Sequence, residues 1–269
     1  MYVAPSAAPS HVRPPSLTHR RPIAALVAVA LLAAGLAAPA ARATENPCVQ
    51  AAWRGLRCPD LVMKHPADLT IDDVYGRKVL RSRSSIDNMG KGPVELDGHR
   101  YAPFLMHARQ RIRLRAGGSI LVDTPATLRF KLIPGQGGYW KLRDAARMEL
   151  WSLGRSGRQQ RLVRVSPKLH YCLRDLQRTH PTLTGSPRSA VYPGCNQDPS
   201  ITHVRLGTSV GWSDIYPAGY YEQWIDVTGL QGRFALVHVA DPENVIFESN
   251  ETNNASRVIV ALPSGRVVG

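Results

Sequence analysis

The densest group of potential metal ligands lies near the C-terminus. Glu248, Asn250, Asn253 and Asn254 place one carboxylate and three amide side chains in a short polar segment. Carboxylate and amide oxygens are the donors that calcium prefers in proteins. Asn and acidic residues also cap turns without any metal. The segment is therefore a candidate calcium site, with plain turn chemistry as the alternative.

Cysteine is the second residue type that indicates chemistry. The chain has four, Cys48, Cys58, Cys172 and Cys195, and an even number in an exported protein favours disulfides. We predict local pairing, Cys48 with Cys58 and Cys172 with Cys195. A zinc site is not indicated, because there is no CxxC pair and His170 is the one histidine near a cysteine. The other histidines considered show no metal-ligand spacing: His99, His107, His203 and His238.

The N-terminus has the pattern of an export signal. An apolar run from Ile23 to Ala38 follows an arginine-bearing start and ends at Ala41-Arg42-Ala43, a small-x-small cleavage pattern. The run is shorter than the roughly 20 residues that span a bilayer. We therefore expect a cleaved signal over residues 1–43, a mature domain over residues 44–269, and a secreted or extracytoplasmic protein without a later membrane span.

The mature chain is basic, with 30 Lys and Arg against 20 Asp and Glu, a net charge of +10. A basic exported surface favours extracellular proteins or cell-wall polymers with an acidic surface as partners. The charges are scattered over short segments, and no helix-turn-helix or zinc-finger spacing organises them. A nucleic-acid partner is therefore not expected.

Short strands separated by turn residues are expected to position these groups, and their recurrence predicts an all-β fold, a single-domain β-sandwich with long loops. The segment from Leu142 to Leu153 suits a helix or a strand equally. The segment from Thr179 to Pro199, rich in Pro, Gly and Ser, is expected to form a long loop closed by the second disulfide. The expected strands are Leu61–Met63, Lys78–Asn88, Val94–Leu96, Arg111–Leu114, Ala126–Leu132, Arg161–Val165, Ile225–Val227, Phe234–Ala240 and Arg257–Ala261.

Several stretches together resemble the lysyl oxidase family. The order and spacing of these stretches carry the resemblance, which reaches upstream to Pro59-Asp-Leu-Val62 and to the stretch from Asn88 to Leu96. It implies a lysyl-oxidase-like fold. The main stretches are Ser166-Pro-Lys-Leu-His-Tyr-Cys-Leu-Arg-Asp175, Gly211-Trp-Ser-Asp-Ile-Tyr216, Gln223-Trp-Ile-Asp-Val-Thr-Gly-Leu230 and the run from Asp241 to Asn254.

The resemblance implies a copper amine oxidase that converts primary amines, including lysine side chains, to aldehydes. Its quinone cofactor would form from Lys168 and Tyr216, and such a quinone captures the amine as a Schiff base. By composition alone, Lys168 would be a solvated charge and Tyr216 a loop anchor. The matched surroundings instead predict that the two lie near each other. Asp60 matches a further oxygen donor of the calcium site in some members.

The chain departs from the family where copper should bind. Members carry a His-x-His-x-His run, but Gly137, Tyr139 and Lys141 stand at these positions, and none is a good copper ligand. A downstream histidine, a candidate proton acceptor, is replaced by Arg147, which does not act as a base near neutral pH. We therefore predict a degenerate member that acts as a binding or structural module. The alternative is an active copper and quinone amine oxidase.

Overall fold

The computed structural model describes residues 45–269. The predicted export signal, residues 1–43, lies outside the described part. Within residues 45–269 no helix is long and apolar enough to cross a membrane.

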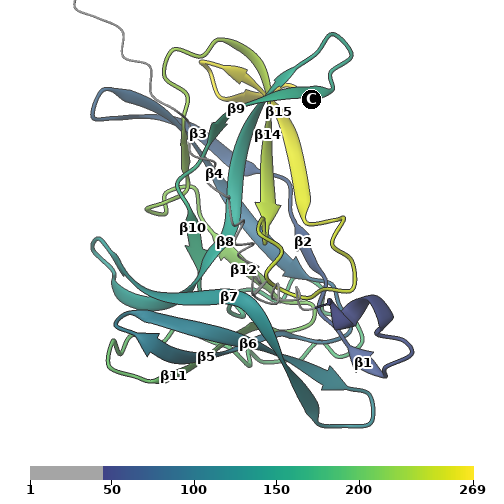
Figure 1. Ribbon diagram of the computed structural model, residues 1–269. Helices are drawn as coiled ribbons and strands as arrows, with labels where there is room; N and C mark the ends of the chain where they lie inside the picture. The colour runs from purple at the N-terminus through teal and green to yellow at the C-terminus, as the bar shows by residue number, and fades with distance from the viewer. Residues whose placement is uncertain (1–44) are drawn as a thin grey trace, which may run out of the picture. The chain divides into compact units, whose positions relative to one another are not determined.

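Antiparallel strands form nearly all of the regular structure (Figure 1). A short 3-10 turn, η1 (Pro47–Gln50), precedes them. The strands are β1 (Leu56–Arg57), β2 (Leu61–Met63), β3 (Ala67–Val74), β4 (Arg77–Asn88), β5 (Val94–Ala102), β6 (Leu105–Leu114), β7 (Ser119–Ile133), β8 (Gly137–Leu153), β9 (Gln159–Val165), β10 (Leu169–Tyr171), β11 (His203–Thr208), β12 (Ser213–Tyr216), β13 (Trp224–Asp226), β14 (Gly232–Ala240), β15 (Ala255–Leu262) and β16 (Arg266–Val267).

The strands are divided between two sheets, and the predicted all-β fold is confirmed. The larger sheet has the order β11-β5-β6-β7-β8-β14-β15-β16, with β1 on β6 and both β9 and β10 on β8. The smaller sheet is built around β4, which pairs with β2, β3, β12 and β13. Figure 1 shows β5, β6, β7 and β11 crossing beneath the upright strands β4, β8, β14 and β15.

Strand β8 joins the two halves of the larger sheet. Its first part, Gly137 to Leu142, pairs with β7, and its second part, Ala146 to Ser152, pairs with β14. The apolar residues of this strand suit a helix or a strand, and its partners decide the matter in favour of a strand. Because neighbours cover the middle of β8, Trp140 and Leu142 are both fully buried.

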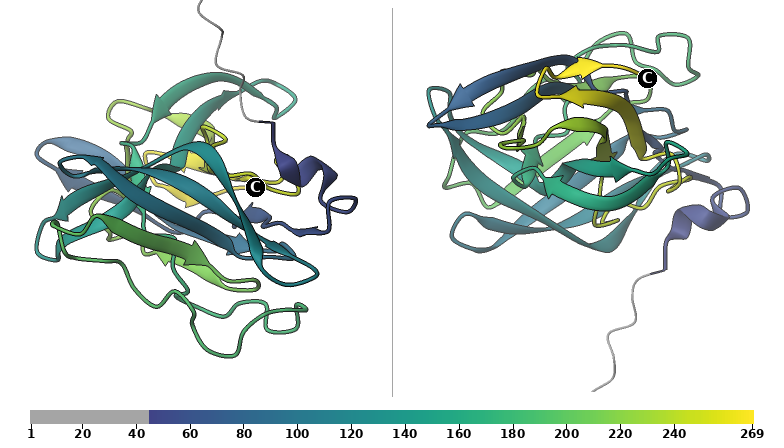
Figure 2. Two further views of the ribbon diagram at one scale, coloured as in Figure 1. Left: turned by 60° about the horizontal axis from the view of Figure 1, so that its bottom comes forward. Right: turned by 90° about the horizontal axis from the view of Figure 1, so that it is seen from above.

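Alternation along the strands builds the core. In β6, Met106, Ala108 and Ile112 point inward while His107 and Arg109 face solvent, as the two-residue period of a strand requires. One apolar cluster lies around β5, β6, β7 and the first half of β8. A second joins β4 and β13 to β14 and β15. Viewed from above, the blue β3–β4 hairpin lies beside the yellow C-terminal strands (Figure 2).

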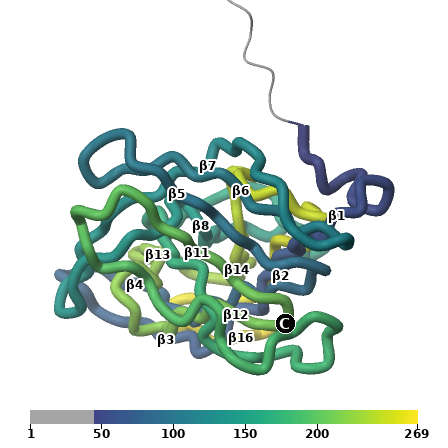
Figure 3. The backbone as a smooth tube through the Cα atoms, turned by 90° about the horizontal axis from the view of Figure 1, so that it is seen from below, coloured from purple at the N-terminus to yellow at the C-terminus, as the bar shows by residue number. Residues whose placement is uncertain are grey.

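Both predicted disulfides are present, Cys48–Cys58 and Cys172–Cys195. The second closes the predicted long loop, which runs between β10 and β11 with a single isolated bridge at Gln177. Seen from below, β11 returns from this loop to lie alongside β5 (Figure 3). The sequence pattern predicts neither β3, which carries several polar residues on exposed positions, nor β11, a short strand in which His203 and Arg205 interrupt the apolar residues.

Candidate functional site

Tyr216 ends β12 and lies inside the protein. Its ring stacks on Tyr171 with centroids 3.7 Å apart, and Tyr220 meets it edge-on at 4.9 Å. The backbone N–H of Cys172 donates to the Tyr216 hydroxyl at 3.0 Å. Burial raises the pKa of Tyr216 well above its usual value, so this phenol is held neutral. We call Tyr171, Tyr216 and Tyr220 the tyrosine cluster.

Lys168 lies outside this cluster. Its side chain is 68% exposed, and its Nζ donates to Asp144 Oδ2 at 2.8 Å. Within residues 45–269, Lys168 is connected to the cluster through its backbone and through His170. The His170 Nδ1 lies 2.9 Å from the Lys168 carbonyl oxygen, and the His170 carbonyl oxygen accepts from Lys141. The two predicted quinone precursors therefore belong to one region, but their side chains do not meet. Crosslinking between them stays a prediction.

Lys141 stands inside the tyrosine cluster. It is 1% exposed, and its Nζ donates to Tyr220 Oη at 2.5 Å and to the His170 carbonyl oxygen at 3.2 Å. The same Nζ lies 5.4 Å from the Tyr216 ring centroid and 4.8 Å from that of Tyr220. Burial lowers the pKa of Lys141 to about 8, although Asp214 and Glu222 oppose this shift. An amine thus stands at the position to which the sequence resemblance assigns the third copper histidine.

The other two positions that the sequence resemblance assigns to copper also lack suitable donors. Gly137 is exposed and has no side chain, and the Tyr139 hydroxyl donates to the Gln136 carbonyl oxygen at 2.7 Å. In residues 45–269 no three or more His, Cys, Asp or Glu side chains are arranged to hold a metal ion. The donors present here do not fit the copper site of the family.

Arg147 and His238, two further residues that the sequence analysis considered, are occupied by structural contacts. Arg147, at the position of the family's downstream histidine, donates to Glu149 Oε1 at 2.7 Å and forms an ion pair with Glu243. His238 is fully buried and lies 2.8 Å from the Ser82 hydroxyl. Burial lowers the pKa of His238 to about 3 and so keeps the imidazole neutral.

Two acids that the sequence interpretation misses lie beside the tyrosine cluster. Asp214 is fully buried, and its Oδ2 accepts from the Leu173 N–H at 3.1 Å. Burial raises its pKa to about 7, while Arg174 and Lys141 oppose the rise. Glu222 is buried and paired with Lys131. Only the resemblance around Tyr216 could have pointed to them, because an isolated Asp or Glu in a strand or loop carries no signal.

The candidate calcium residues do gather in space. Asp60 accepts from Asn253 Nδ2 at 2.8 Å, and Glu248 Oε1 accepts from Asn254 Nδ2 at 2.8 Å. The other Glu248 oxygen accepts from the Leu61 N–H. Four of the five predicted residues therefore meet where the segment after Cys58 passes the C-terminal turn.

Asn250 lies away from these residues, and Glu251, which the sequence analysis did not name, lies among them. Asn250 is exposed, and its Oδ1 accepts from the N–H and hydroxyl of Thr252, which is ordinary turn chemistry. Glu251 instead faces the cluster: its Oε1 accepts from Asn46 Nδ2 at 2.8 Å, and its pKa is raised by burial and by the nearby acids Asp241 and Asp60. We call Asp60, Glu248, Glu251, Asn253 and Asn254 the oxygen cluster.

The donor types of this set are those that a hard cation prefers, although the three carboxylates are not arranged as a ready-made metal site within residues 45–269. Within the described residues, Glu251 Oε2, Asn253 Oδ1 and Asn254 Oδ1 are buried oxygens without a hydrogen-bond partner. Burial also raises the pKa of Glu248 well above its usual value, and the Glu251 charge adds to this rise. A cation that shared these oxygens would satisfy the unpaired acceptors and neutralise the repulsion.

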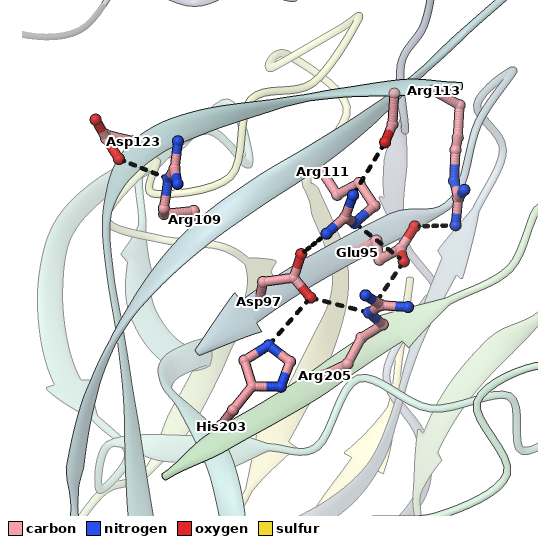
Figure 4. Close-up of polar contacts among 9 residues, drawn as sticks. Glu95, Asp97, Arg109, Arg111, Arg113, Asp123, His203 and Arg205 are labelled. Atoms are coloured by element: carbon pink, nitrogen blue, oxygen red, sulfur yellow. Dashed lines mark hydrogen bonds and ion pairs between the residues drawn. The ribbon is translucent and has the colours of Figure 1, made fainter. Parts of the chain in front are cut away.

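A charged ladder covers the outer face of β11, β5 and β6 (Figure 4). Glu95 and Asp97 of β5 are buried beneath Arg111 and Arg113 of β6 and Arg205 of β11. Arg111 donates to Asp97 at 2.5 Å, and Arg205 donates to Asp97 at 2.9 Å. Arg111, Arg113 and Arg205 are therefore engaged in ion pairs within the sheet.

Comparison with known proteins concerns the C-terminal part of the chain. The lysyl oxidase family model matches residues 168–268, so this part of the chain is similar to the lysyl oxidase family. The matched segment contains Lys168, Tyr216 and the C-terminal part of the oxygen cluster, and it begins after the positions Gly137, Tyr139 and Lys141. A comparison with curated proteins finds no match.

Proposed function

We propose that this chain is an exported member of the lysyl oxidase family that acts as a binding or structural module and has lost copper-dependent amine oxidation. One observation supports the proposal: the Lys141 amine, at the position that the resemblance assigns to the third copper histidine, is buried and donates to the Tyr220 hydroxyl. A lysine there brings positive charge toward any cation unless it is deprotonated. The two disulfides fit export to an oxidising compartment.

Metal analysis and an amine oxidase assay test the loss of activity. The protein is produced through the export route in medium with added copper, and its bound copper, its quinone absorption band and its amine-dependent peroxide release are measured. We expect background values for all three. A matched variant with Gly137→His, Tyr139→His and Lys141→His is expected to regain copper. Stoichiometric copper, a quinone band and peroxide release in the unaltered protein would show an active oxidase instead.

The proposed partner is an extracellular protein with an acidic surface. A groove of about 840 Å³ is lined by Tyr75, Tyr221 and Trp224 together with Arg77, Arg81 and Lys131. Tyr75 is fully exposed in the two-residue turn between β3 and β4, with a positive φ of 49° that a tyrosine adopts only at a cost. Aromatic rings beside cations suit a partner that combines apolar and acidic side chains.

Binding to polyglutamate at two salt concentrations tests this groove. The Arg77→Gln and Tyr75→Asn double variant is expected to bind at least tenfold more weakly than the unaltered protein. The matched control removes two exposed arginines of the β8–β9 turn, Arg155→Gln and Arg158→Gln, and is expected to bind as before. Equal losses in both variants would mean that binding reflects net charge and not the groove. Preference for an anionic wall polysaccharide over polyglutamate would replace the protein partner.

The oxygen cluster supports a structural calcium ion as part of the module. Asp60, Glu248 and Glu251 would supply carboxylate oxygens, and Asn253 and Asn254 would supply amide oxygens. Such an ion would connect the segment after Cys58 to the turn before β15.

A further inference from the structure

Lys141 is an unusual lysine, because it is almost wholly buried without a carboxylate bonded to it. Lysine is rarely buried unless its charge is paired. The acceptors of its Nζ are the Tyr220 hydroxyl and the His170 carbonyl oxygen, both formally neutral. A lysine in such surroundings has a larger neutral fraction than a solvated one, and a neutral amine is a nucleophile.

A small cavity gives this amine room to react. The cavity has a volume of about 80 Å³, and Lys141, Arg174, Tyr139, Tyr216 and Tyr220 line it together with the Cys172–Cys195 disulfide. Gln136, also on the lining, is exposed, so the cavity borders solvent there. The volume admits a molecule of a few heavy atoms and excludes a bulky side chain.

Arg174 supplies the second recognition element. Its Nε is buried and has no hydrogen-bond partner within residues 45–269. A guanidinium with free donors is suited to bind a carboxylate. The cavity therefore combines an amine that attacks carbonyl carbon with a cation that holds a carboxylate.

We propose that Lys141 captures a small oxo acid, such as glyoxylate, as an imine, with the ligand carboxylate on Arg174. The Nζ lone pair attacks the carbonyl carbon and forms a C–N bond. The carbonyl oxygen then leaves as water after taking up two protons, which come from the nitrogen and from solvent or the Tyr220 hydroxyl. No electrons are gained or lost, and the iminium formed keeps the positive charge that Lys141 has when protonated.

The charged groups around Lys141 favour this reaction near neutral pH. Burial and the cations of Lys131 and Arg174 lower its pKa, while Asp214 and Glu222 raise it, and the outcome is about 8. The rings of Tyr139, Tyr216 and Tyr220 also face its Nζ, and the His170 contact is through the backbone carbonyl oxygen. At pH 7 the neutral fraction is on the order of a hundredfold larger than that of a solvated lysine.

Reductive trapping of the folded, disulfide-intact protein tests the proposal. The protein is treated at neutral pH with limiting glyoxylate and cyanoborohydride, which converts an imine to a stable carboxymethyl amine. The rate of labelling of each lysine is then read from peptide masses. We expect Lys141 to be labelled at least tenfold faster than Lys168, the exposed lysine of the same region, which serves as an internal reference.

Two comparisons separate capture from simple reactivity. Arg174→Gln is expected to slow glyoxylate labelling of Lys141 about tenfold and to leave labelling by acetaldehyde, which has no carboxylate, unchanged. Circular dichroism confirms that the variant is folded, and the labelling of the unaltered protein does not depend on any variant. An unlabelled Lys141, a Lys141 rate no higher than that of Lys168, or equal glyoxylate rates with and without Arg174 would each overturn the proposal. None of these outcomes depends on copper, so the oxidase question is decided separately.

Discussion

Asp214 is a carboxylic acid held away from solvent beside the tyrosine cluster. Its Oδ1 has no hydrogen-bond partner in the described part of the chain, and burial raises its pKa to about 7. The nearby charges of Arg174 and Lys141 oppose this rise, so the pKa of Asp214 in the folded protein is lower than burial alone would make it. The protonation of this group is therefore tied to folding, because an unfolded Asp ionises near pH 4.

Asp214→Asn is expected to remove part of the pH dependence of stability. Between about pH 4 and pH 7 the folded protein binds the Asp214 proton and the unfolded chain does not, so the contribution of Asp214 to stability falls as pH rises through this window, by roughly 4 kcal/mol at most. Urea unfolding from pH 4 to pH 8 measures the effect as a flatter profile in the variant. Asp123→Asn, which changes an exposed acid, is the control. Parallel profiles for the unaltered protein and Asp214→Asn would contradict the raised pKa.

At the scale of the elements, the buried acids of β5 depend on arginines of the neighbouring strands to neutralise their charge. Burial alone would raise the pKa of Asp97, but hydrogen bonds and charge from Arg205 and Arg111 lower it below its usual value. These arginines belong to β11 and β6, the strands on either side of β5. The ladder therefore holds β11, which returns from the long loop, against the rest of the sheet.

Asp97→Ala is expected to destabilise the protein by about 2–4 kcal/mol, because Arg111 and Arg205 each lose one of two carboxylate partners and keep only the longer contact with Glu95. The control is Asp123→Ala on β7. Asp123 pairs with Arg109 at 2.9 Å, but its side chain is 82% exposed, so its loss is expected to change stability by less than about 1 kcal/mol. Chemical denaturation at fixed pH measures both. Equal effects would mean that the ladder is no stronger than a surface pair.

At the scale of the whole molecule, the oxygen cluster joins segments far apart in the chain. Asn46 and Asp60 come from the start of the described residues, and Glu248, Glu251 and Asn253 come from the turn before β15. The Cys48–Cys58 disulfide fixes the first of these segments nearby, and Cys48 Sγ contacts the Phe247 carbonyl oxygen. A cation at this point would stabilise the contact between the two ends of the fold.

Calcium is expected to raise the melting temperature, with a stabilisation of about 2.7 kcal/mol when its concentration is a hundredfold above the dissociation constant. Asn253→Ala is expected to abolish this increment. Asn250→Ala is the matched control, because its Oδ1 is bonded to Thr252 and not to the cluster. It is expected to lose the turn contact but to keep the response to calcium. Thermal scans with calcium, magnesium or chelator measure all three proteins, and equal responses in the two variants would count against the site.

Local patterns in the sequence predict several of the strands, both disulfides and the family resemblance of this protein. Alternation of apolar and polar residues predicts β7, because it sets which face of the strand is buried, and a nearly continuous apolar run predicts β14, which is buried on both faces. The even cysteine count and short separations predict both disulfides. The stretches around Lys168 and Tyr216 indicate the lysyl oxidase family, and the residues at positions 137, 139 and 141 predict that the copper histidines are replaced.

Only the tertiary structure decided where these groups lie. Contacts between strands and turns distant in sequence bury Lys141 and place Lys168 outward. Such contacts also bring Glu251, and not Asn250, into the oxygen cluster. Leu142 to Leu153 is a strand because β14, β9 and β10 offer edges to it. The physical reason is common to all: desolvation and hydrogen-bond partners come from distant segments, so no local pattern records them.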